Sequence, residues 1–302
     1  MYWGALLEMA DKDFLKFETV VANPGLLSLA AEQLDKRVAD NPSDANAIWQ
    51  LAETYRKLGE LEKAAALYST LCRLTGQGQL ARDLLAVTEG KPQDFVGQDG
   101  CYPVPFVIKN NYLSDDELSM LCDYVSAEAW ENCEPSKVGK GKHDDTLRRS
   151  FDLAMPDWLK KKMRQEIVDY LPELTCALNV AGEKFDRIDL SLRSYGDGHF
   201  FGIHTDKRPN IQRLLSLTYF FFIEPKNFTG GDLLIFDSDV GQSEGRSFSE
   251  CFTRLQATQN SLVVFPSASY HAVSTVNAKA GNTAHYRYAV NGHVWEQSSN
   301  EQ

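Results

Sequence analysis

The 302-residue chain has no long apolar run and no excess of basic residues, and each absence excludes a class of protein. No stretch approaches the roughly 20 apolar residues that a membrane-spanning helix needs. The 31 lysines and arginines are outnumbered by 42 acidic residues, giving a net charge of -11. Nucleic-acid binding requires clustered cations, so we expect neither a membrane nor a nucleic-acid partner.

Cysteines at metal-binding spacings are also missing. The six cysteines are scattered without a CxxC pair, which excludes a recognisable zinc motif and makes a reducing compartment the simplest environment. The segment MYWGALLEMADKDFLKF carries acids where a signal peptide has its positively charged region. We therefore expect a cytoplasmic protein whose acidic charge supports solubility.

The type of periodicity changes along the chain. Helical spacing runs from Met1 to about Gly90, a linker rich in glycine, proline and polar residues follows at 90–103, and short β-type runs dominate from Phe185 to Trp295. This order predicts a helical module of residues 1–92 and a second domain of residues 93–302.

The helical module resembles a short tetratricopeptide array. Residues 47–76 form two amphipathic patterns that meet at a glycine-containing turn, with repeat-like residues at Leu51, Tyr55, Gly59, Ala64 and Tyr68. Residues 26–42 resemble the second helix of an earlier, degenerate repeat. Because a free-standing solenoid needs about three repeats, the module is either a surface for a peptide or protein partner, or a helical buttress or dimer contact.

The second domain is predicted to begin with mixed structure and to continue as strands. We expect a helix starting near Ser114, a polar, basic loop at 133–150 and a helix over 156–181. The strand patterns that follow are FDRIDLSLRSY, RLLSLTYFFFI, GGDLLIFD, SLVVFPSA, YHAVSTV and HYRYAVNGHVW. Short strands separated by turns, without intervening helices, predict an antiparallel barrel or jelly roll, so the fold class is α+β.

One segment, YGDGHFFGIHTD at 195–206, carries the pattern of a metal site. His204 and Asp206 are two residues apart on an expected strand, so both side chains point to one face and can reach one ion. His271, which follows an apolar strand, is the expected third ligand. Two imidazoles and a carboxylate occupy one face of an octahedron and leave three positions open. A surface His–Asp pair with an unrelated core histidine is the alternative, and the ordered strands around these residues favour the metal site.

Together these motifs resemble the prolyl 4-hydroxylase-type branch of the Fe(II)- and 2-oxoglutarate-dependent dioxygenases, over roughly Tyr102 to Trp295. The resemblance implies a double-stranded β-helix, or jelly roll, with His204, Asp206 and His271 as iron ligands. It also implies 2-oxoglutarate as cosubstrate, O2 as oxidant, support by ascorbate, and release of succinate and CO2. The carboxylate of Asp206 favours hydroxylation over halogenation, since halogenases of the superfamily replace it with a small residue.

The family also uses a cation for the distal carboxylate of 2-oxoglutarate, on a strand after the second histidine. Arg287 suits this role because its planar guanidinium pairs bidentately with a carboxylate. Its separation from His271 is longer than is usual in the family, and Lys279 competes at the shorter separation. Lys279 lies in an expected turn, so we favour Arg287.

Other pocket residues are expected with core packing as the alternative for each: Tyr195, Asn291, and either Thr218 or Tyr219, depending on strand register. We expect His199 and His293 to be structural or to lie at the pocket edge. Gly230 and Gly231 predict a tight turn or a close approach of strands.

The substrate is less well defined by the motifs. The loops at 133–150 and 237–250 are expected to flank the mouth of the barrel as lids. The helical module and the resemblance favour a prolyl residue of a peptide or protein, with a free amino acid or a carrier-bound small molecule as alternatives. A helical scaffold with a catalytically silent barrel is the alternative of another class, and the intact ligand set argues against it.

Overall fold

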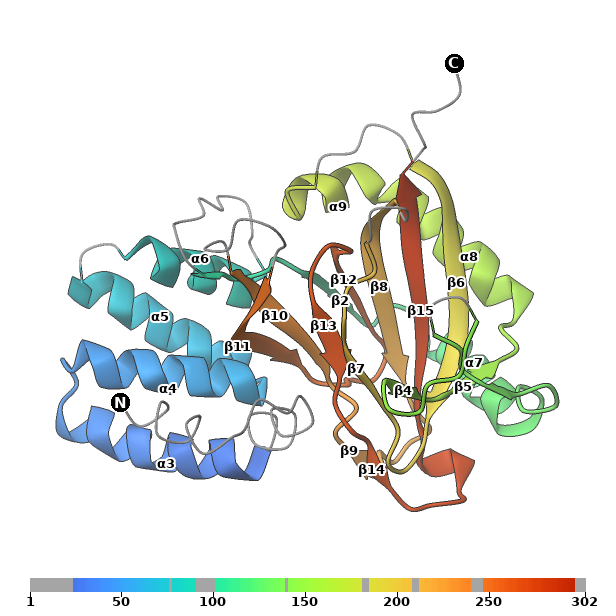
Figure 1. The fold of residues 1–302 in the computed structure, drawn as a ribbon, viewed down its shortest axis with the longest axis horizontal. Helices are drawn as coiled ribbons and strands as arrows, with labels where there is room; N and C mark the ends of the chain where they lie inside the picture. Colours follow the sequence, from blue (N-terminus) through green and yellow to red (C-terminus); the bar gives the residue numbers. More distant parts are fainter. Residues whose placement is uncertain are drawn as a thin grey trace. The chain divides into compact units, whose positions relative to one another are not determined.

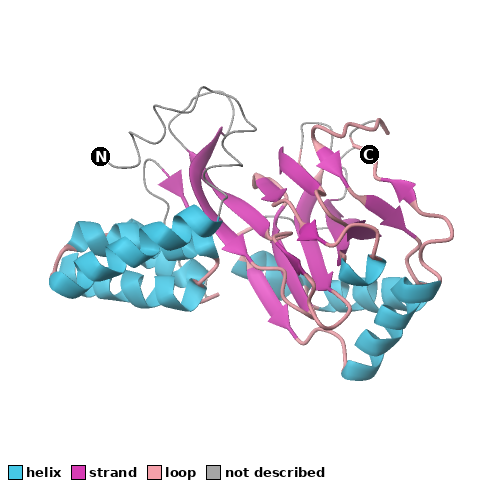
Figure 2. Ribbon diagram, turned by 90° about the horizontal axis from the view of Figure 1, so that it is seen from below, coloured by secondary structure: helices cyan, strands magenta, loops and turns pink. Residues whose placement is uncertain are grey.

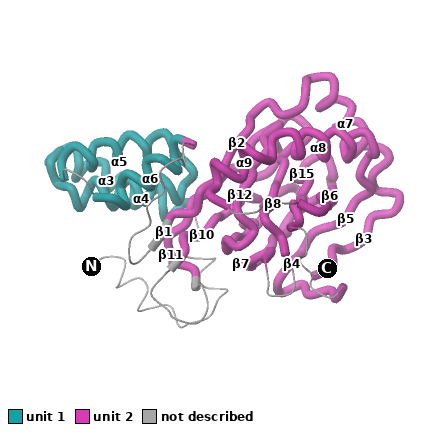
Figure 3. Tube along the Cα trace, turned by 90° about the horizontal axis from the view of Figure 1, so that it is seen from above, with its two compact units in different colours: residues 1–89 teal, residues 90–302 magenta. Residues whose placement is uncertain are grey.

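The computed structural model describes residues 24–75, 78–90, 101–138, 141–180, 185–207, 212–239 and 247–296. The chain separates into two compact units, residues 1–89 and residues 90–302 (Figure 3). The expected helical start at residues 1–23 and most of the expected linker, residues 91–100, lie outside the described residues.

The described part of the first unit is helical, as predicted, and consists of α3 (Pro24–Asp40), α4 (Ala45–Leu58), α5 (Leu61–Thr75) and α6 (Gln79–Thr88). Each helix packs against the next along the chain. The Asp44 side chain caps α4 by accepting a hydrogen bond from the Ala47 amide at 3.0 Å, and Gly59 ends it with a left-handed φ of 80°. The expected glycine-containing turn between two helices is therefore present.

A charged network is buried among these helices. The Arg56 side chain is 1% exposed, and its Nη2 donates to Glu53 Oε2 at 2.8 Å. The Tyr68 hydroxyl donates to the other carboxylate oxygen. Burial raises the pKa of Glu53, but Arg56 and Tyr68 outweigh burial and leave that pKa below its ordinary value. The ionised carboxylate thus links α4 to α5.

The second unit contains two antiparallel sheets, which confirms the predicted α+β jelly-roll class (Figure 2). The larger sheet has the order β2 (Val107–Asn110), β12 (Ser261–Pro266), β8 (Arg213–Phe221), β15 (Arg287–Glu296), β6 (Phe185–Tyr195), β5 (Phe151–Leu153), β3 (Glu134–Pro135). The smaller has the order β1 (Cys101–Tyr102), β10 (Leu233–Asp239), β13 (His271–Val273), β7 (Phe200–His204), β4 (Arg148–Arg149), with β11 (Ser247–Leu255) paired to β10. A separate ribbon joins β9 (Phe228–Thr229) to β14 (Asn277–Ala278).

Three helices share a core with the larger sheet: α7 (Asp115–Ala127), α8 (Asp157–Asp169) and α9 (Leu171–Ala177) (Figure 1). Ser114 and Glu117 form a capping box at the start of α7, where the sequence predicted a helix N-terminus. The prediction of a single helix over 156–181 is wrong, because the segment forms two helices. The first ends at Asp169 and the second begins at Leu171, because Pro172 lacks an amide hydrogen and fits only the first turn of a helix.

The strands of the larger sheet present different chemistry on their two faces. On β8, Leu215, Leu217, Tyr219 and Phe221 belong to the core formed with the helices. The alternate residues Ser216, Thr218 and Phe220 point to the opposite face, which we call the inner face. Thr218 lies opposite Asn291 of β15, and Ser216 lies opposite His293. The inner face is therefore largely polar, and it carries the candidate site.

Two segments differ from the expected loops. The stretch 133–150 contains β3 and β4, and its Arg148 is only 6% exposed, because pairing of β4 with β7 brings this arginine inward. The stretch 237–250 begins in β10 and ends in β11, a strand that the sequence patterns missed, and its residues 240–246 lie outside the described residues. None of the described helices is long and apolar enough to cross a membrane.

Candidate metal and cosubstrate site

The structure brings His204, Asp206 and His271 together from two neighbouring strands. His204 ends β7, His271 begins β13, and the two histidines lie directly opposite each other in an antiparallel pair. One potential ligand atom from each of the three residues lies within 4.8 Å of the others. The Asp206 carboxylate is 3.8 Å from His204 Nε2 and 3.4 Å from His271 Nε2. We call these three residues the metal triad.

Both histidines of the metal triad are oriented by backbone carbonyls. Nδ1 of His204 lies 2.9 Å from the Gly202 carbonyl oxygen, and Nδ1 of His271 lies 3.0 Å from that of Ser269. A carbonyl only accepts, so Nδ1 carries the hydrogen and Nε2 offers its lone pair to the triad. Burial, reinforced by the neighbouring His271, lowers the pKa of His204 to about 3. A neutral imidazole is the form that binds a metal, so these residues fit a ferrous ion.

The Asp206 carboxylate is held by three side chains of the larger sheet. Ser216 Oγ donates to Oδ2 at 2.7 Å, His293 Nε2 lies 3.2 Å from the same oxygen, and Arg213 Nη1 donates to Oδ1 at 3.4 Å. Burial raises the pKa of Asp206, but His271 and His293 outweigh burial and hold that pKa well below its usual range. The carboxylate is therefore ionised and oriented before any metal binds.

His293 connects this carboxylate to a second one. Its Nδ1 lies 2.7 Å from Asp189 Oδ1 on the adjacent strand β6. The sequence predicted that His293 is structural or lies at the pocket edge, and it did not identify Asp189, Arg213 or Ser216. The sequence did contain a hint. His293 lies six residues after Arg287 and Asp189 six residues before Tyr195, so each shares a strand face with an expected pocket residue. These residues position Asp206 and are not part of the metal triad.

Arg287 is a buried cation whose guanidinium forms no ion pair within the described part of the chain. Its side chain is 1% exposed, and none of its three guanidinium nitrogens has a hydrogen-bond partner among the described residues. The guanidinium carbon lies 4.5 Å from the centre of the Tyr195 ring and 4.9 Å from that of Phe220. Burial lowers its pKa to about 10, which leaves it charged at neutral pH. A buried, unpaired charge is costly, so this site fits the carboxylate of a ligand such as 2-oxoglutarate. Lys279, the competitor, is exposed.

Glycine is required beside Arg287. Gly231 has a φ of 70°, and a Cβ there would lie 2.9 Å from Arg287 Cδ. At Gly230, which also has positive φ, a Cβ would lie 2.0 Å from the Thr275 carbonyl oxygen. The glycine pair thus makes a close approach to a neighbouring segment and leaves room for the arginine.

The remaining pocket residues lie on different faces. Tyr195 lies directly opposite Arg287, and its hydroxyl accepts a hydrogen bond from Arg148 Nη2 at 3.3 Å. Burial raises the pKa of Tyr195, but Arg148, with Arg287 and Arg193, outweighs burial and lowers it. Thr218 and Asn291 share the inner face with Arg287.

Tyr219 and His199 are placed away from these inner-face residues. Tyr219 belongs to the helix-covered core, where its hydroxyl donates to Asn260 Oδ1 at 3.0 Å. Of the two alternatives on β8, the inner-face position therefore goes to Thr218. The His199 ring is 5.4 Å from the Phe151 ring, and its Nδ1 is buried without a hydrogen-bond partner among the described residues.

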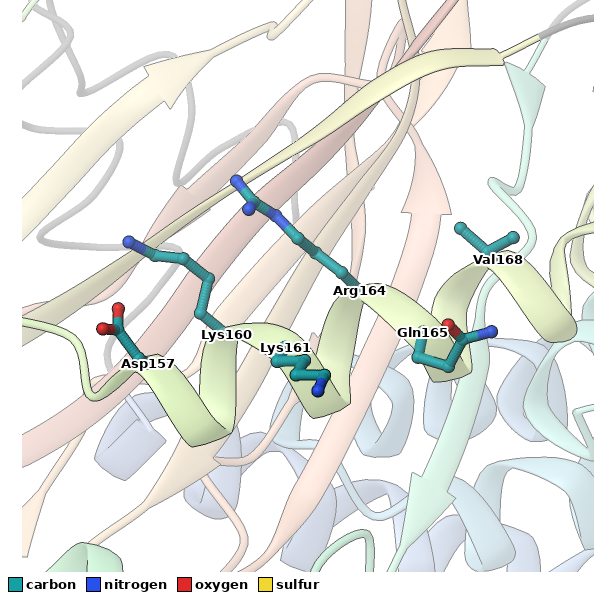
Figure 4. Close-up of a pocket in the computed structure, with 6 residues that line it drawn as sticks. All are labelled: Asp157, Lys160, Lys161, Arg164, Gln165 and Val168. Carbon is teal, nitrogen blue, oxygen red and sulfur yellow. The ribbon is translucent and has the colours of Figure 1, made fainter.

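A basic surface hollow along α8 is separate from this site. It is lined by Asp157, Lys160, Lys161, Arg164, Gln165 and Val168. Lys160 and Arg164 extend from the same side of the helix (Figure 4). Arg164 Nε donates to the Ile188 carbonyl oxygen at 3.1 Å, which ties this side chain to β6. No residue of the metal triad lines this hollow.

The known proteins that resemble this chain are oxygenases and hydroxylases. Residues 190–295 match the 2OG-Fe(II) oxygenase superfamily. An uncharacterized PKHD-type hydroxylase of Synechocystis sp. is 30% identical over 186 residues, which are 61% of this chain and 61% of that protein. A PKHD-type hydroxylase of Shewanella baltica is 29% identical over 178 residues, 55% of this chain and 70% of that protein. The chain thus spans somewhat less than two thirds of the cyanobacterial relative.

Similar solved structures include a Pseudomonas putida prolyl-4-hydroxylase, with 16% identity, a TM-score of 0.45 and coverage of 64% of this chain and 93% of that one. A Trichoplax adhaerens prolyl hydroxylase in complex with a hypoxia inducible factor peptide fragment has 15% identity, a TM-score of 0.47 and coverage of 63% and 83%. The family match spans both histidines of the triad, Asp206 and Arg287. Residues 190–295, which carry the metal triad and Arg287, are therefore similar to the 2OG-Fe(II) oxygenase superfamily.

Proposed function

We propose that the protein is an Fe(II)- and 2-oxoglutarate-dependent dioxygenase that hydroxylates an unactivated C–H bond, with release of succinate and CO2. The observation that carries this proposal is the buried guanidinium of Arg287, which has no hydrogen-bond partner among the described residues. It shares the inner face with Ser216 and His293, whose side chains contact Asp206 of the metal triad. A metal triad alone fits many metals, and an anion site alone fits many ligands. Their combination fits a dicarboxylate that binds the ion at one end and the arginine at the other.

Each part of the site has a separate task in this reaction. His204, Asp206 and His271 would hold the ferrous ion, which supplies oxidation by O2 at the expense of 2-oxoglutarate. Arg287 orients the distal carboxylate, with Tyr195 and Phe220 forming the walls around its guanidinium. These aromatic walls exclude water, which strengthens the pairing of the guanidinium with a carboxylate.

We propose a prolyl residue of a peptide or protein as the substrate. The resemblance to prolyl 4-hydroxylases and the PKHD-type hydroxylase relatives support this choice. The proposal includes a cytoplasmic location, support of activity by ascorbate, and a role for residues 1–92 in contacting the substrate, a partner or a second copy. A free amino acid or a carrier-bound intermediate is the second candidate, since the inner-face polar residues Thr218 and Asn291 also suit a small ligand.

The test is formation of succinate from 2-oxoglutarate in the presence of Fe(II) and ascorbate, with mass spectrometry following the gain of one oxygen by the substrate. Proline-containing peptides, free amino acids and cell lysate form three arms that separate the substrate classes. We expect His204→Ala and Asp206→Ala to abolish succinate formation, and His143→Ala, a change at an exposed histidine, to retain it. Succinate at the level of a metal-free control in every arm would mean that the barrel is catalytically silent.

A further inference from the structure

A second buried guanidinium lies near Arg287 without a carboxylate partner. Arg148 on β4 is 6% exposed, and its Nε donates to Ser150 Oγ at 2.9 Å. Its Nη2 donates to the Tyr195 hydroxyl at 3.3 Å. Within the described residues, its hydrogen-bond partners are thus two neutral hydroxyl groups, which orient the cation and leave its charge uncompensated.

Arg148 is connected through one intervening side chain to the metal triad and through another to Arg287. Its guanidinium carbon lies 4.4 Å from the centre of the Phe201 ring, and that ring stacks on His204 with the centroids 3.7 Å apart. Tyr195, which accepts from Arg148, lies directly opposite Arg287. Arg148 therefore lies one side chain away from a residue of the metal triad and one side chain away from the cosubstrate arginine.

Three carboxylates of this region are paired with other cations. Asp152 lies 3.2 Å from Arg193 Nε. Asp189 lies 2.7 Å from His293, and Asp232 lies 2.9 Å from Arg254. None of these acids supplies the missing counterion of Arg148 within the described structure.

Binding of Fe(II) and 2-oxoglutarate would not supply a counterion for Arg148 either. The two charges of a ferrous ion would be matched by Asp206 and by one carboxylate of 2-oxoglutarate, and Arg287 would match the other carboxylate. The guanidinium of Arg148 would still have no carboxylate partner among the described residues. Because an unpaired buried charge is costly, a carboxylate supplied by the substrate would stabilise Arg148.

We propose that Arg148 binds a carboxylate of the substrate, so that the preferred substrate is anionic close to the hydroxylated carbon. This inference rests on the proposed function and adds a substrate class to it. The carboxylate belongs either to an acidic side chain next to the target residue of a peptide, or to the α-carboxylate of a free amino acid. In both cases the planar guanidinium, fixed by Ser150 and Tyr195, recognises the same group.

Equilibrium binding to the full-length protein, loaded with Fe(II) and 2-oxoglutarate under argon, tests this inference without turnover. One arm compares blocked pentapeptides with a central proline flanked by Glu with the same peptides flanked by Gln. The other arm compares L-proline with L-prolinamide. In one of the two arms we expect the acid to bind roughly tenfold to hundredfold more tightly than its amide, as for a charge-assisted pair. The arm that shows the preference identifies the source of the carboxylate.

Variants at two adjacent arginines locate the effect. Arg148→Gln should remove the preference for the acid, and Arg148→Lys should retain part of it, because the charge remains without the planar geometry. The matched control is Arg149→Gln. Arg149 is exposed and next in sequence, so this variant should keep the wild-type preference.

Two outcomes would overturn the inference. Equal binding of acid and amide by the wild-type protein in both arms is the first, and loss of the preference in Arg149→Gln to the same extent as in Arg148→Gln is the second. If Arg148→Gln does not fold, Arg148→Lys and the wild-type comparison still decide. Absence of succinate formation by the wild type would reject the proposed function together with this inference, whereas equal binding by an active enzyme rejects this inference alone.

Discussion

Replacing Gly231 with alanine tests whether the space beside Arg287 is required for cosubstrate binding. The added Cβ would lie 2.9 Å from Arg287 Cδ and 2.9 Å from Val276 Cγ2, so that one of these side chains must move by several tenths of an ångström. The backbone at Gly231 has a φ of 70°, which costs a non-glycine residue about 1–2 kcal/mol. Alanine thus imposes two separable penalties, one on folding and one on the arginine.

Displacement of Arg287, the second penalty, should weaken the binding of 2-oxoglutarate. A hydrogen bond to a charged group contributes about 1.5–3 kcal/mol, so loss of one of the two bonds of a bidentate pair should raise the apparent KM for 2-oxoglutarate by roughly tenfold to hundredfold. Gly281→Ala is the control. Gly281 has a φ of 76°, and a Cβ there would meet no atom within 4 Å, so it shares the backbone strain without the contact.

The assay is succinate formation as a function of 2-oxoglutarate concentration, together with thermal unfolding of both variants. The shared strain should lower Tm by about 2–8 °C in each, since a domain of this size loses about 2–4 °C per kcal/mol. Only Gly231→Ala should raise the KM. Equal KM values for Gly231→Ala, Gly281→Ala and the wild type would refute the assignment of Arg287 to the cosubstrate carboxylate.

Three other substitutions test contacts elsewhere in the chain. Glu53→Gln should destabilise the helical unit by about 3–5 kcal/mol, because it removes the ionised acceptor that Arg56 and Tyr68 share in a buried network, as measured by circular dichroism melts. The folded-state pKa of Glu53 is lowered, so its stabilisation is present above the unfolded value of about 4.5 and is lost as pH falls below it; the variant should lack this acid-dependent loss. Asn260→Ala removes the acceptor of the Leu113 amide at 2.8 Å and should cost about 1–3 kcal/mol in chemical unfolding, and an unchanged midpoint would show that water replaces it. Ser216→Ala removes the 2.7 Å hydrogen bond to Asp206 and should weaken Fe(II) binding roughly tenfold to hundredfold in competition with a chelator, whereas unchanged affinity would remove Ser216 from the set that positions the carboxylate.

The features that follow from local patterns were predictable from the sequence. The strand predicted at 185–195 coincides with β6, because its residues alternate regularly, and the cap at Ser114 follows from the acids after it. The shared direction of His204 and Asp206 follows from the two-residue period of a strand. These features depend on residues that are close in sequence.

The features that depend on pairing between distant segments were not predictable. Arg148 lies in a basic, polar stretch that reads as an exposed loop, and it is buried because β4 pairs with β7. The strand β11 was missed because polar residues interrupt its apolar ones, and pairing with β10 stabilises it. The choice between Thr218 and Tyr219 depends on strand register, since a shift of one residue exchanges the two faces of a strand.

The division of β8 into two faces has a consequence for protein engineering and for evolution. Thr218 can be substituted to alter the chemistry of the pocket while Leu215 and Leu217 continue to supply the core. Stability and specificity can therefore vary independently by substitution. Insertion of a single residue within the strand would change stability and specificity together, because it would turn core residues into the pocket and pocket residues into the core. We accordingly expect changes of length to be tolerated in the turns that join the strands, and substitutions to be the only route by which the strands themselves acquire a new substrate.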